Sequence, residues 1–140
     1  MEQNNPVINK FFEMYASVSM KANPDRHADL YADEFIAAGP QGSAVFKNDN
    51  KFLEWLKQVY TINQNTGMES LQVISVQSNP IGDTYSFATV EWGAKFKKTG
   101  EKLVRFEISY LLQFIQNEPK ILAYVDHEDQ QKVMKELGLA

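Results

Sequence analysis

The stretch Tyr31–Ser43, which reads YADEFIAAGPQGS, decides the fold of this chain. We interpret it as a helix that runs directly into a short strand and then into the turn Pro40–Ser43, because proline followed by glycine marks a change of chain direction. The elements on either side of this junction follow from their own start signals and residue spacing.

Helix start signals occur three times. Asn5–Pro6 combines an N-cap residue with proline at the first helical position, and apolar residues at helical spacing extend this helix to about Met20. Asn23–Pro24 repeats the signal, so a short second helix should carry Leu30–Tyr31. A third helix is expected after the caps offered by Asn48–Asn50.

The second half of the chain changes to the period-two spacing of strands. A strand that starts near Leu71 should end at a turn over Asn79–Asp83, and residues 88–96 alternate between apolar and polar side chains. Lys98–Gly100 fits a three-residue hairpin loop with glycine at the left-handed position, and residues 104–114 alternate again in the return strand. These strands are expected to pair as an antiparallel meander.

The chain should end in one more strand and a helix. Asn117–Pro119 is expected to turn into a strand over Lys120–Asp126, and a short helix over Asp129–Leu137 should stop at Gly138, a favourable C-cap. Helices followed by an antiparallel meander make an α+β domain, and we expect a single domain over residues 1–140. Because the long strands are apolar on one face only, the sheet has to curl around the helices that cover that face.

Composition excludes several classes of function. With 14 basic and 18 acidic residues the net charge is −4, and no basic stripe is visible, so nucleic acid is not an expected partner. The absence of cysteine excludes disulfides, thiolate metal sites and cysteine nucleophiles. The N-terminus lacks the pattern of a signal peptide, and no apolar run approaches the roughly 20 residues that cross a bilayer. We therefore expect no membrane partner and a cytoplasmic location.

The order of elements, with the junction Ala32–Phe35 and the turn Pro40–Ser43, resembles the nuclear transport factor 2-like superfamily. Within it, the chain resembles the SnoaL-like polyketide cyclases and the ketosteroid isomerases. Tyr15 and the strand start at Lys120–Ile121 match as well, and the resemblance covers Phe11–Leu137. It implies a cone-shaped barrel in which a curved, mainly antiparallel sheet wraps around N-terminal helices, with a short C-terminal helix. It also implies frequent homodimers and a deep pocket for a small hydrophobic ligand.

The resemblance to the ketosteroid isomerases implies three catalytic groups. A junction aspartate removes a proton, while a tyrosine in the first helix and a protonated strand acid stabilise the enolate. Tyr15 lies where the tyrosine belongs, but the base position is Gly39, and no acid lies near Tyr110–Leu112. Since one group of the three remains, ketosteroid isomerase activity is not expected.

The resemblance to the polyketide cyclases implies an acid–base residue in the pocket. Asp126 and His127, at the mouth of the last strand, are the candidates, with Tyr15 as hydrogen-bond donor; a histidine titrates near neutral pH. The alternative is that Asp126–Asp129 simply ends a strand and caps the terminal helix, whose positive end favours acidic side chains.

Aromatic residues are candidates for the pocket wall, because aromatic walls suit flat or sterol-like molecules. The alternative is that each of them belongs to the core, and that the Tyr15 hydroxyl bonds to a backbone carbonyl. The predicted ligand-binding residues are Tyr15, Phe35, Trp55, Trp92, Tyr110, Tyr124, Asp126 and His127.

The remaining charged residues offer one further candidate cluster. Glu91, Arg105 and Glu107 should lie together on one sheet face, as a solvated or subunit-facing network or, if that face is concave, as a polar interior site. His27 is expected at the surface of a charged helix. Because the chain offers only His27 and His127 beside its carboxylates, we predict no metal site and no cofactor.

Two functions are compatible with these patterns. The first is a protein that binds a small hydrophobic molecule in a conical pocket, with or without cyclase- or isomerase-type acid–base chemistry, and that lacks the ketosteroid isomerase base. The second is a non-catalytic dimerisation or interaction domain with a vestigial cavity, whose exposed sheet face is its working surface. We take the first as the predicted function and keep the second as the alternative.

Overall fold

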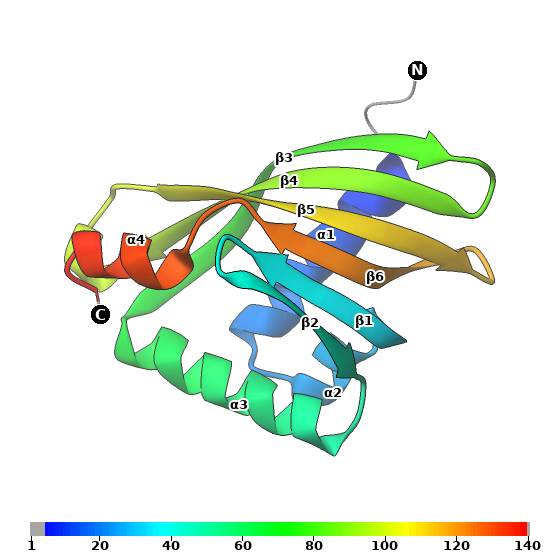
Figure 1. Cartoon of the computed structure of the whole chain (residues 1–140). Helices are drawn as coiled ribbons and strands as arrows, with labels where there is room; N and C mark the ends of the chain where they lie inside the picture. The colour runs from blue at the N-terminus through cyan, green and yellow to red at the C-terminus, as the bar shows by residue number, and fades with distance from the viewer. Residues whose placement is uncertain (1–4, 140) are drawn as a thin grey trace.

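The computed structural model describes residues 5–139 and places helices on the concave side of one curved sheet (Figure 1). The six strands are β1 (Tyr31–Gly39), β2 (Gly42–Lys47), β3 (Met68–Ile81), β4 (Tyr85–Phe96), β5 (Val104–Ile115) and β6 (Glu118–Asp126). The helices are α1 (Pro6–Met20), α2 (Pro24–Ala28), α3 (Asn50–Asn65) and α4 (Gln130–Glu136), with a 3-10 turn, η1, at Lys97–Thr99.

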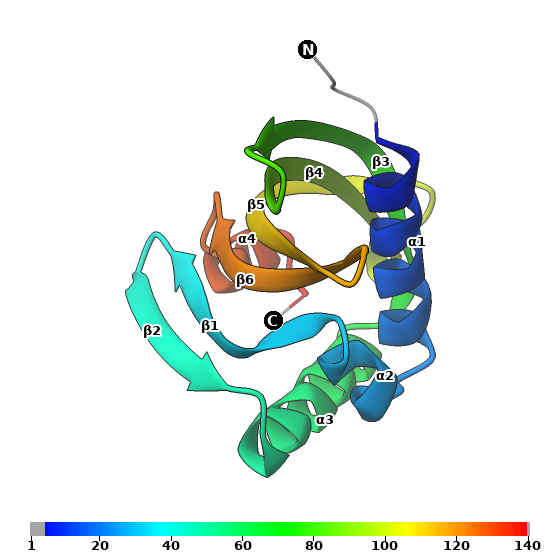
Figure 2. The same cartoon turned by 90° about the vertical axis from the view of Figure 1, so that its right-hand side faces the viewer.

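The sheet has the strand order β2-β1-β6-β5-β4-β3, and among these described strands only the β1–β6 pair is parallel. The strand that comes last in the sequence therefore lies in the middle of the sheet. Figure 2 shows the sheet curling around, with α1 beside β3 and α3 below the strand β1. The α+β cone with a mainly antiparallel sheet, which the sequence predicted, is confirmed.

The predicted helix starts are confirmed by side-chain caps. The Asn5 carboxamide accepts hydrogen bonds from the backbone nitrogens of Val7 and Ile8, and Asn23 caps α2 in the same way. Asp49 caps α3. Each cap satisfies backbone N–H groups that a helix start leaves without a partner. No helix within residues 5–139 is both long enough and apolar enough to span a membrane.

The quoted stretch contains no helix, so the predicted helix-to-strand junction is wrong. α2 ends at Ala28, and the chain is already a strand at Tyr31. The reason is pairing with a distant segment: Tyr31 lies opposite Ile121 of β6, and the Asn48 side chain donates hydrogen bonds to the carbonyls of Ala28 and Tyr31. The predicted turn is confirmed, with Pro40–Gln41 joining β1 to β2.

The connection between β4 and β5 is longer than the predicted three-residue loop at Lys98–Gly100. The 3-10 turn follows Phe96, and β5 begins only at Val104. The Thr99 hydroxyl holds this turn together, because it accepts from the nitrogen of Phe96 and donates to the carbonyl of the same residue. The predicted conformation of Gly100 is confirmed in part, since its φ is +62°.

The C-terminal elements follow the prediction closely. β6 begins at Glu118, two residues earlier than expected, because the turn before it is made by Gln116–Asn117, which both have positive φ. Asp129 caps α4 by accepting from the backbone nitrogen of Lys132, and Gly138 follows the helix with a φ of +73°. The last helix is thereby fixed beside the end of β6.

The concave face of the sheet shares a large hydrophobic cluster with α1, α2 and α3, and a second, smaller cluster of Ala94, Phe96, Val104 and Leu139 packs against Met134 of α4. The predicted alternation of β4 is confirmed, because Ala88, Val90, Trp92, Ala94 and Phe96 are all buried. Burying one large apolar side chain contributes roughly 1.5–3 kcal/mol. The larger cluster therefore occupies the inner end of the cone, and the open end lies where β1, β2, β6 and α4 meet.

Candidate functional site

Three of the predicted pocket residues lie together at the inner end of the cone. Trp92 and Tyr110 are 1% and 2% exposed, and the Trp92 indole donates a hydrogen bond of 3.1 Å to the Tyr110 hydroxyl. The Tyr15 hydroxyl lies 2.6 Å from that of Tyr31, which the sequence did not single out as a site residue. These side chains pack against one another as part of the core.

Burial keeps these phenols protonated. It raises the pKa of Tyr15, Tyr31 and Tyr110, because a phenolate has no water to solvate it inside the cone. The Tyr15–Tyr31 pair has two hydroxyl hydrogens and shares one hydrogen bond, so one hydrogen points elsewhere. The inner end of the cone is thus a neutral environment rich in hydrogen-bond donors.

His27 is not at the surface, contrary to the prediction. Its side chain is 3% exposed, with Nδ1 2.8 Å from the Tyr60 hydroxyl and the ring 4.7 Å from that of Tyr15. The reason is that α2 has only five residues and packs against both α1 and α3, so its inner side is covered by their aromatic rings. Burial lowers the pKa of His27 to about 4.

The open end of the cone contains a hollow of about 430 Å³, which we call the mouth hollow. The β1–β2 hairpin forms one side of it, and the end of β6 with the start of α4 forms the other. Its lining includes Phe46, Tyr124, Asp126, Glu128, Asp129 and Gln130. A volume of this size suits a small molecule.

The inner wall of the mouth hollow is aromatic. Phe46 and Tyr124 line the hollow, and behind them they surround a much smaller gap of about 10 Å³ together with Phe35, Phe52 and Trp55. The Trp55 ring stacks on the rings of Phe46 and Phe52, at 6.5 and 6.0 Å between centroids. The structure thus brings the predicted residues Phe35, Trp55 and Tyr124 together here, although Trp55 is 43% exposed.

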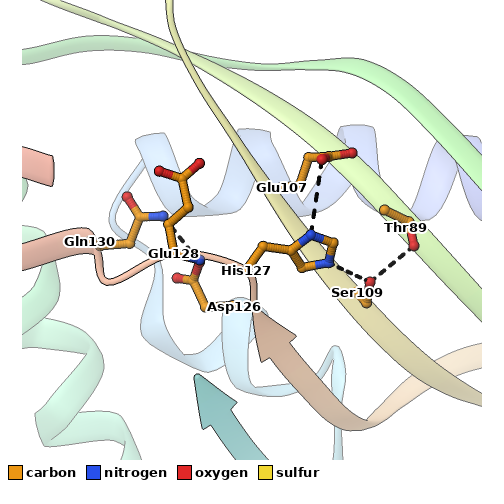
Figure 3. A network of polar contacts seen from close by, with 7 residues as sticks. All are labelled: Thr89, Glu107, Ser109, Asp126, His127, Glu128 and Gln130. Carbon is orange, nitrogen blue, oxygen red and sulfur yellow. Dashed lines mark hydrogen bonds and ion pairs between the residues drawn. The ribbon is translucent and has the colours of Figure 1, made fainter. Parts of the chain in front are cut away.

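Asp126 is the polar counterpart of this wall. It lies two residues after Tyr124 on β6, so both side chains point to the same side of the sheet. Its carboxylate accepts hydrogen bonds of 3.1 Å from the Gln130 side chain and from the backbone nitrogen of Glu128 (Figure 3). Burial raises the pKa of Asp126, and these two hydrogen bonds oppose that shift.

Gly39 lies directly beside Asp126. A Cβ atom added to Gly39 would lie 3.6 Å from the Cβ of Asp126, because β1 and β6 are parallel neighbours at this point. The position at which the sequence lacks a junction acid is therefore adjacent to a carboxyl group that comes from another strand.

His127 lies on the opposite, outer face of the sheet, so the structure separates it from Asp126. Its Nε2 atom is 2.7 Å from the Ser109 hydroxyl, which is 3.0 Å from the Thr89 hydroxyl, and its Nδ1 atom is 3.9 Å from the Glu107 carboxylate (Figure 3). Ser109 and Thr89 were not predicted as partners of His127. Their signal was present in the sequence, since both occupy the polar positions of strands that were expected to pair.

The other predicted charge network also lies on the outer face. Arg105 and Glu91 form an ion pair of 3.7 Å, and Glu91 lies opposite Glu107 in the β4–β5 register. The 3.7 Å distance confirms the predicted proximity. The Arg105 side chain is 60% exposed, so the network is solvated and is not a polar interior site. Within the part of the chain that the structure describes, no three His, Asp or Glu side chains gather in a way that could hold a metal ion.

Comparisons with known proteins agree with this architecture. Residues 2–129 match the model of a family described as NTF2-like protein (DUF6841). A search of curated proteins finds no match to the sequence.

Solved structures with similar folds include three that illustrate the range. An NTF2-like protein of unknown function from Shewanella oneidensis has 11% identity and a TM-score of 0.67, covering 86% of this chain and 96% of its own. Aln2 from a Streptomyces species has 8% identity and a TM-score of 0.70, covering 96% and 99%. The β subunit of benzoate 1,2-dioxygenase from Burkholderia mallei has 12% identity and a TM-score of 0.66, covering 95% and 96%. At these identities the likeness extends to the fold alone.

Proposed function

Because the chain belongs to the family of NTF2-like proteins (DUF6841), we propose that it binds a small hydrophobic molecule in the mouth hollow of its cone. One observation carries this proposal: Tyr124 and Asp126, two residues apart on β6, face the same hollow and give it an aromatic wall and a polar anchor. Binding sites for small molecules combine such apolar walls with a few polar groups that fix orientation.

The charges of the mouth hollow restrict the class of ligand. Asp126, Glu128 and Asp129 line it, and its lining includes no lysine or arginine from the described residues. A carboxylate ligand would meet repulsion there, whereas a hydroxyl or ammonium group would donate a hydrogen bond to Asp126. We therefore propose a neutral or cationic, flat, hydrophobic ligand that carries one hydrogen-bond donor.

Asp126 is also the residue on which acid–base chemistry would rest. Its raised pKa brings proton exchange closer to neutral pH, which is what a general acid or base requires. Its position beside Gly39 supports a role in place of the missing junction acid. The Tyr15 hydroxyl is hydrogen-bonded to that of Tyr31 behind the aromatic wall, and we assign Tyr15 the role of a hydrogen-bond donor.

The proposal is tested by calorimetric titration with 2-naphthol and with 2-naphthoate, two flat probes that differ in charge. We expect 2-naphthol to bind more tightly, and Asp126→Asn to weaken its binding about tenfold through the loss of a charge-assisted hydrogen bond. Tyr124→Ala should weaken the binding of both probes. Glu107→Gln on the outer face is the matched control and should leave the binding of both unchanged.

The opposite results would contradict the proposal. If 2-naphthoate bound as well as 2-naphthol, or if Glu107→Gln weakened 2-naphthol as much as Asp126→Asn did, the mouth hollow would not be the binding site. A screen of hydrophobic metabolites without any shift in melting temperature would count against ligand binding altogether.

A second function, assembly through the outer sheet face, is favoured by a separate observation. Phe87 and Val125 are 42% and 47% exposed on that face, and Leu111 lies opposite Phe87 in the β4–β5 register. An exposed apolar strip of this kind is typical of an interface. We propose a second copy of the chain as the partner, and light scattering of the wild type and of Phe87→Lys tests it. A monomeric wild type would contradict this proposal.

A further inference from the structure

A second hollow, of about 530 Å³, lies on the helical side of the molecule and shares no residue with the mouth hollow. We call it the helix-side groove. It is formed by Val7–Met14 of α1, by Arg26–Leu30 in and after α2, and by Glu118–Lys120 at the start of β6. Figure 2 shows α1 and α2 on the same side of the molecule as the β5–β6 turn.

The floor of the helix-side groove is apolar. Phe11, Leu30 and Pro119 are buried at its base. Val7 and Met14, each one turn from Phe11 on the same stripe of α1, remain 49% and 45% exposed along it. The stripe therefore offers an elongated apolar surface about two helical turns long, or roughly 10 Å.

The rim of the groove carries three cations. Lys10, Arg26 and Lys120 line it, and none of them takes part in any of the ion pairs found among residues 5–139. Lys120 instead donates to the backbone carbonyl of Asp29, and the Arg26 guanidinium lies 4.0 Å from the Met14 sulfur.

The charge of this rim differs from that of the whole chain. The carboxylates of Asp29 and Glu118 also line the groove, so it holds three positive and two negative side chains. The whole chain has a net charge of −4, and the charged side chains that line the mouth hollow are all carboxylates. A local excess of cations above an apolar floor matches a molecule with an apolar tail and an anionic head.

We propose that the helix-side groove binds an unbranched, medium-chain carboxylate. Its apolar chain would lie along Val7, Phe11 and Met14, and its head would meet Arg26 and Lys10. Arginine favours a carboxylate because the planar guanidinium donates two parallel hydrogen bonds to it. The groove thus selects for a class of ligand that the mouth hollow repels.

The test is calorimetric titration of the full chain with decanoate and decyltrimethylammonium, each below its critical micelle concentration, and with decan-1-ol below its solubility limit. We expect decanoate to bind saturably with one site, decan-1-ol to bind more weakly, and the cation not to bind. The double variant Lys10→Gln with Arg26→Gln should weaken the binding of decanoate about tenfold, because it removes two partly exposed charge contacts. Met14→Asp, which places a negative charge on the exposed part of the floor, should weaken it further.

Matched controls distinguish the helix-side groove from the mouth hollow and from a membrane-binding surface. Lys132→Gln with Lys135→Gln removes two charges from α4 and should leave decanoate binding unchanged; equal weakening by both double variants would overturn the proposal. Loss of decanoate binding in Tyr124→Ala but not in Lys10→Gln with Arg26→Gln would place the molecule in the mouth hollow and also overturn it. Binding to phosphatidylglycerol vesicles without saturable decanoate binding would overturn it in favour of a membrane-surface patch.

Discussion

The Nδ1 atom of His27 lies 2.8 Å from the phenolic oxygen of Tyr60, inside a cage whose other nearby rings, Tyr15 and Tyr31, are phenols as well. Its Nε2 atom is buried and has no hydrogen-bond partner among the described residues. A proton added to this imidazole would therefore be desolvated, with only neutral groups around the ring. This is the physical cause of its lowered pKa.

Folding stability should consequently fall in mild acid. In the unfolded chain His27 has its ordinary pKa of 6.5 and is protonated below that pH, whereas in the folded chain its pKa is about 4. The free energy of unfolding therefore decreases as the pH falls from about 6.5 to about 4. The expected loss is about 3 kcal/mol, measured as urea denaturation against pH. His27→Gln should remove most of this dependence, while His127→Gln should retain it. Equal pH profiles for the wild type and His27→Gln would contradict the prediction.

The two tryptophans should differ sharply in their effect on stability. Trp92 is 1% exposed and bonded to Tyr110, whereas Trp55 is 43% exposed at the cone mouth. We expect Trp92→Ala to cost about 3–5 kcal/mol and Trp55→Ala about 1 kcal/mol in urea denaturation. Trp92 should also dominate the blue edge of the fluorescence spectrum. A larger loss for Trp55→Ala would contradict this arrangement.

Asp126→Asn should make the protein more stable at neutral pH, while it weakens the binding of the proposed ligand. The folded-state pKa of Asp126 is raised by burial, so the ionised carboxylate destabilises the fold, and this cost grows as pH rises through that pKa. The asparagine has no charge to bury. Comparison of the two melting temperatures between acidic and neutral pH measures the effect, and a lower stability of the variant at neutral pH would contradict it.

Gly39→Asp should place a second carboxylate beside Asp126. Because the two Cβ atoms would be 3.6 Å apart, the charges repel, and we expect the variant to be about 1 kcal/mol less stable than Gly39→Asn at neutral pH. The difference should disappear in acid, where both carboxyl groups are protonated. Gly39→Ala, whose added Cβ meets only ordinary contacts, should change stability little, and melting curves of the three variants provide the comparison.

The hydroxyl contacts of His127 on the outer face should contribute more to folding stability than its contact with Glu107. Ser109→Ala removes the hydroxyl that pairs with the His127 Nε2 atom and should cost about 1 kcal/mol in urea denaturation. Glu107→Gln should cost less than about 0.5 kcal/mol, because the Glu107–His127 pair is exposed and 3.9 Å long. The reverse order would show that the contact with Glu107, and not the hydrogen bond to Ser109, fixes His127.

Local signals were sufficient for most elements of the fold. The caps at Asn5, Asn23 and Asp49 and the alternation of β4 and β5 predicted their elements because neighbouring residues fix them. The start of β1 could not be predicted in this way, because its pairing partner, Ile121, is about ninety residues distant.

The candidate site depended more heavily on distant contacts. Asp126 was identified from its place at the mouth of the last strand and Tyr124 as an aromatic side chain suited to a pocket wall, and the two do line one hollow. The burial of His27 depends on Tyr60 in another helix, and the role of Phe46 depends on a hairpin stacking against α3. Neither contact can be predicted from the residues that are its neighbours in the sequence.

The central position of β6 also determines when the fold can form. Among the strands that the structure describes, β6 alone joins the β3–β5 meander to the β1–β2 hairpin, and it is made of residues 118–126. A nascent chain that has not yet released this segment from the ribosome has a meander and a separate hairpin, with no strand to pair them. Closure of the cone is thus a late, long-range event, and folding on the ribosome should wait until residues 118–126 have emerged.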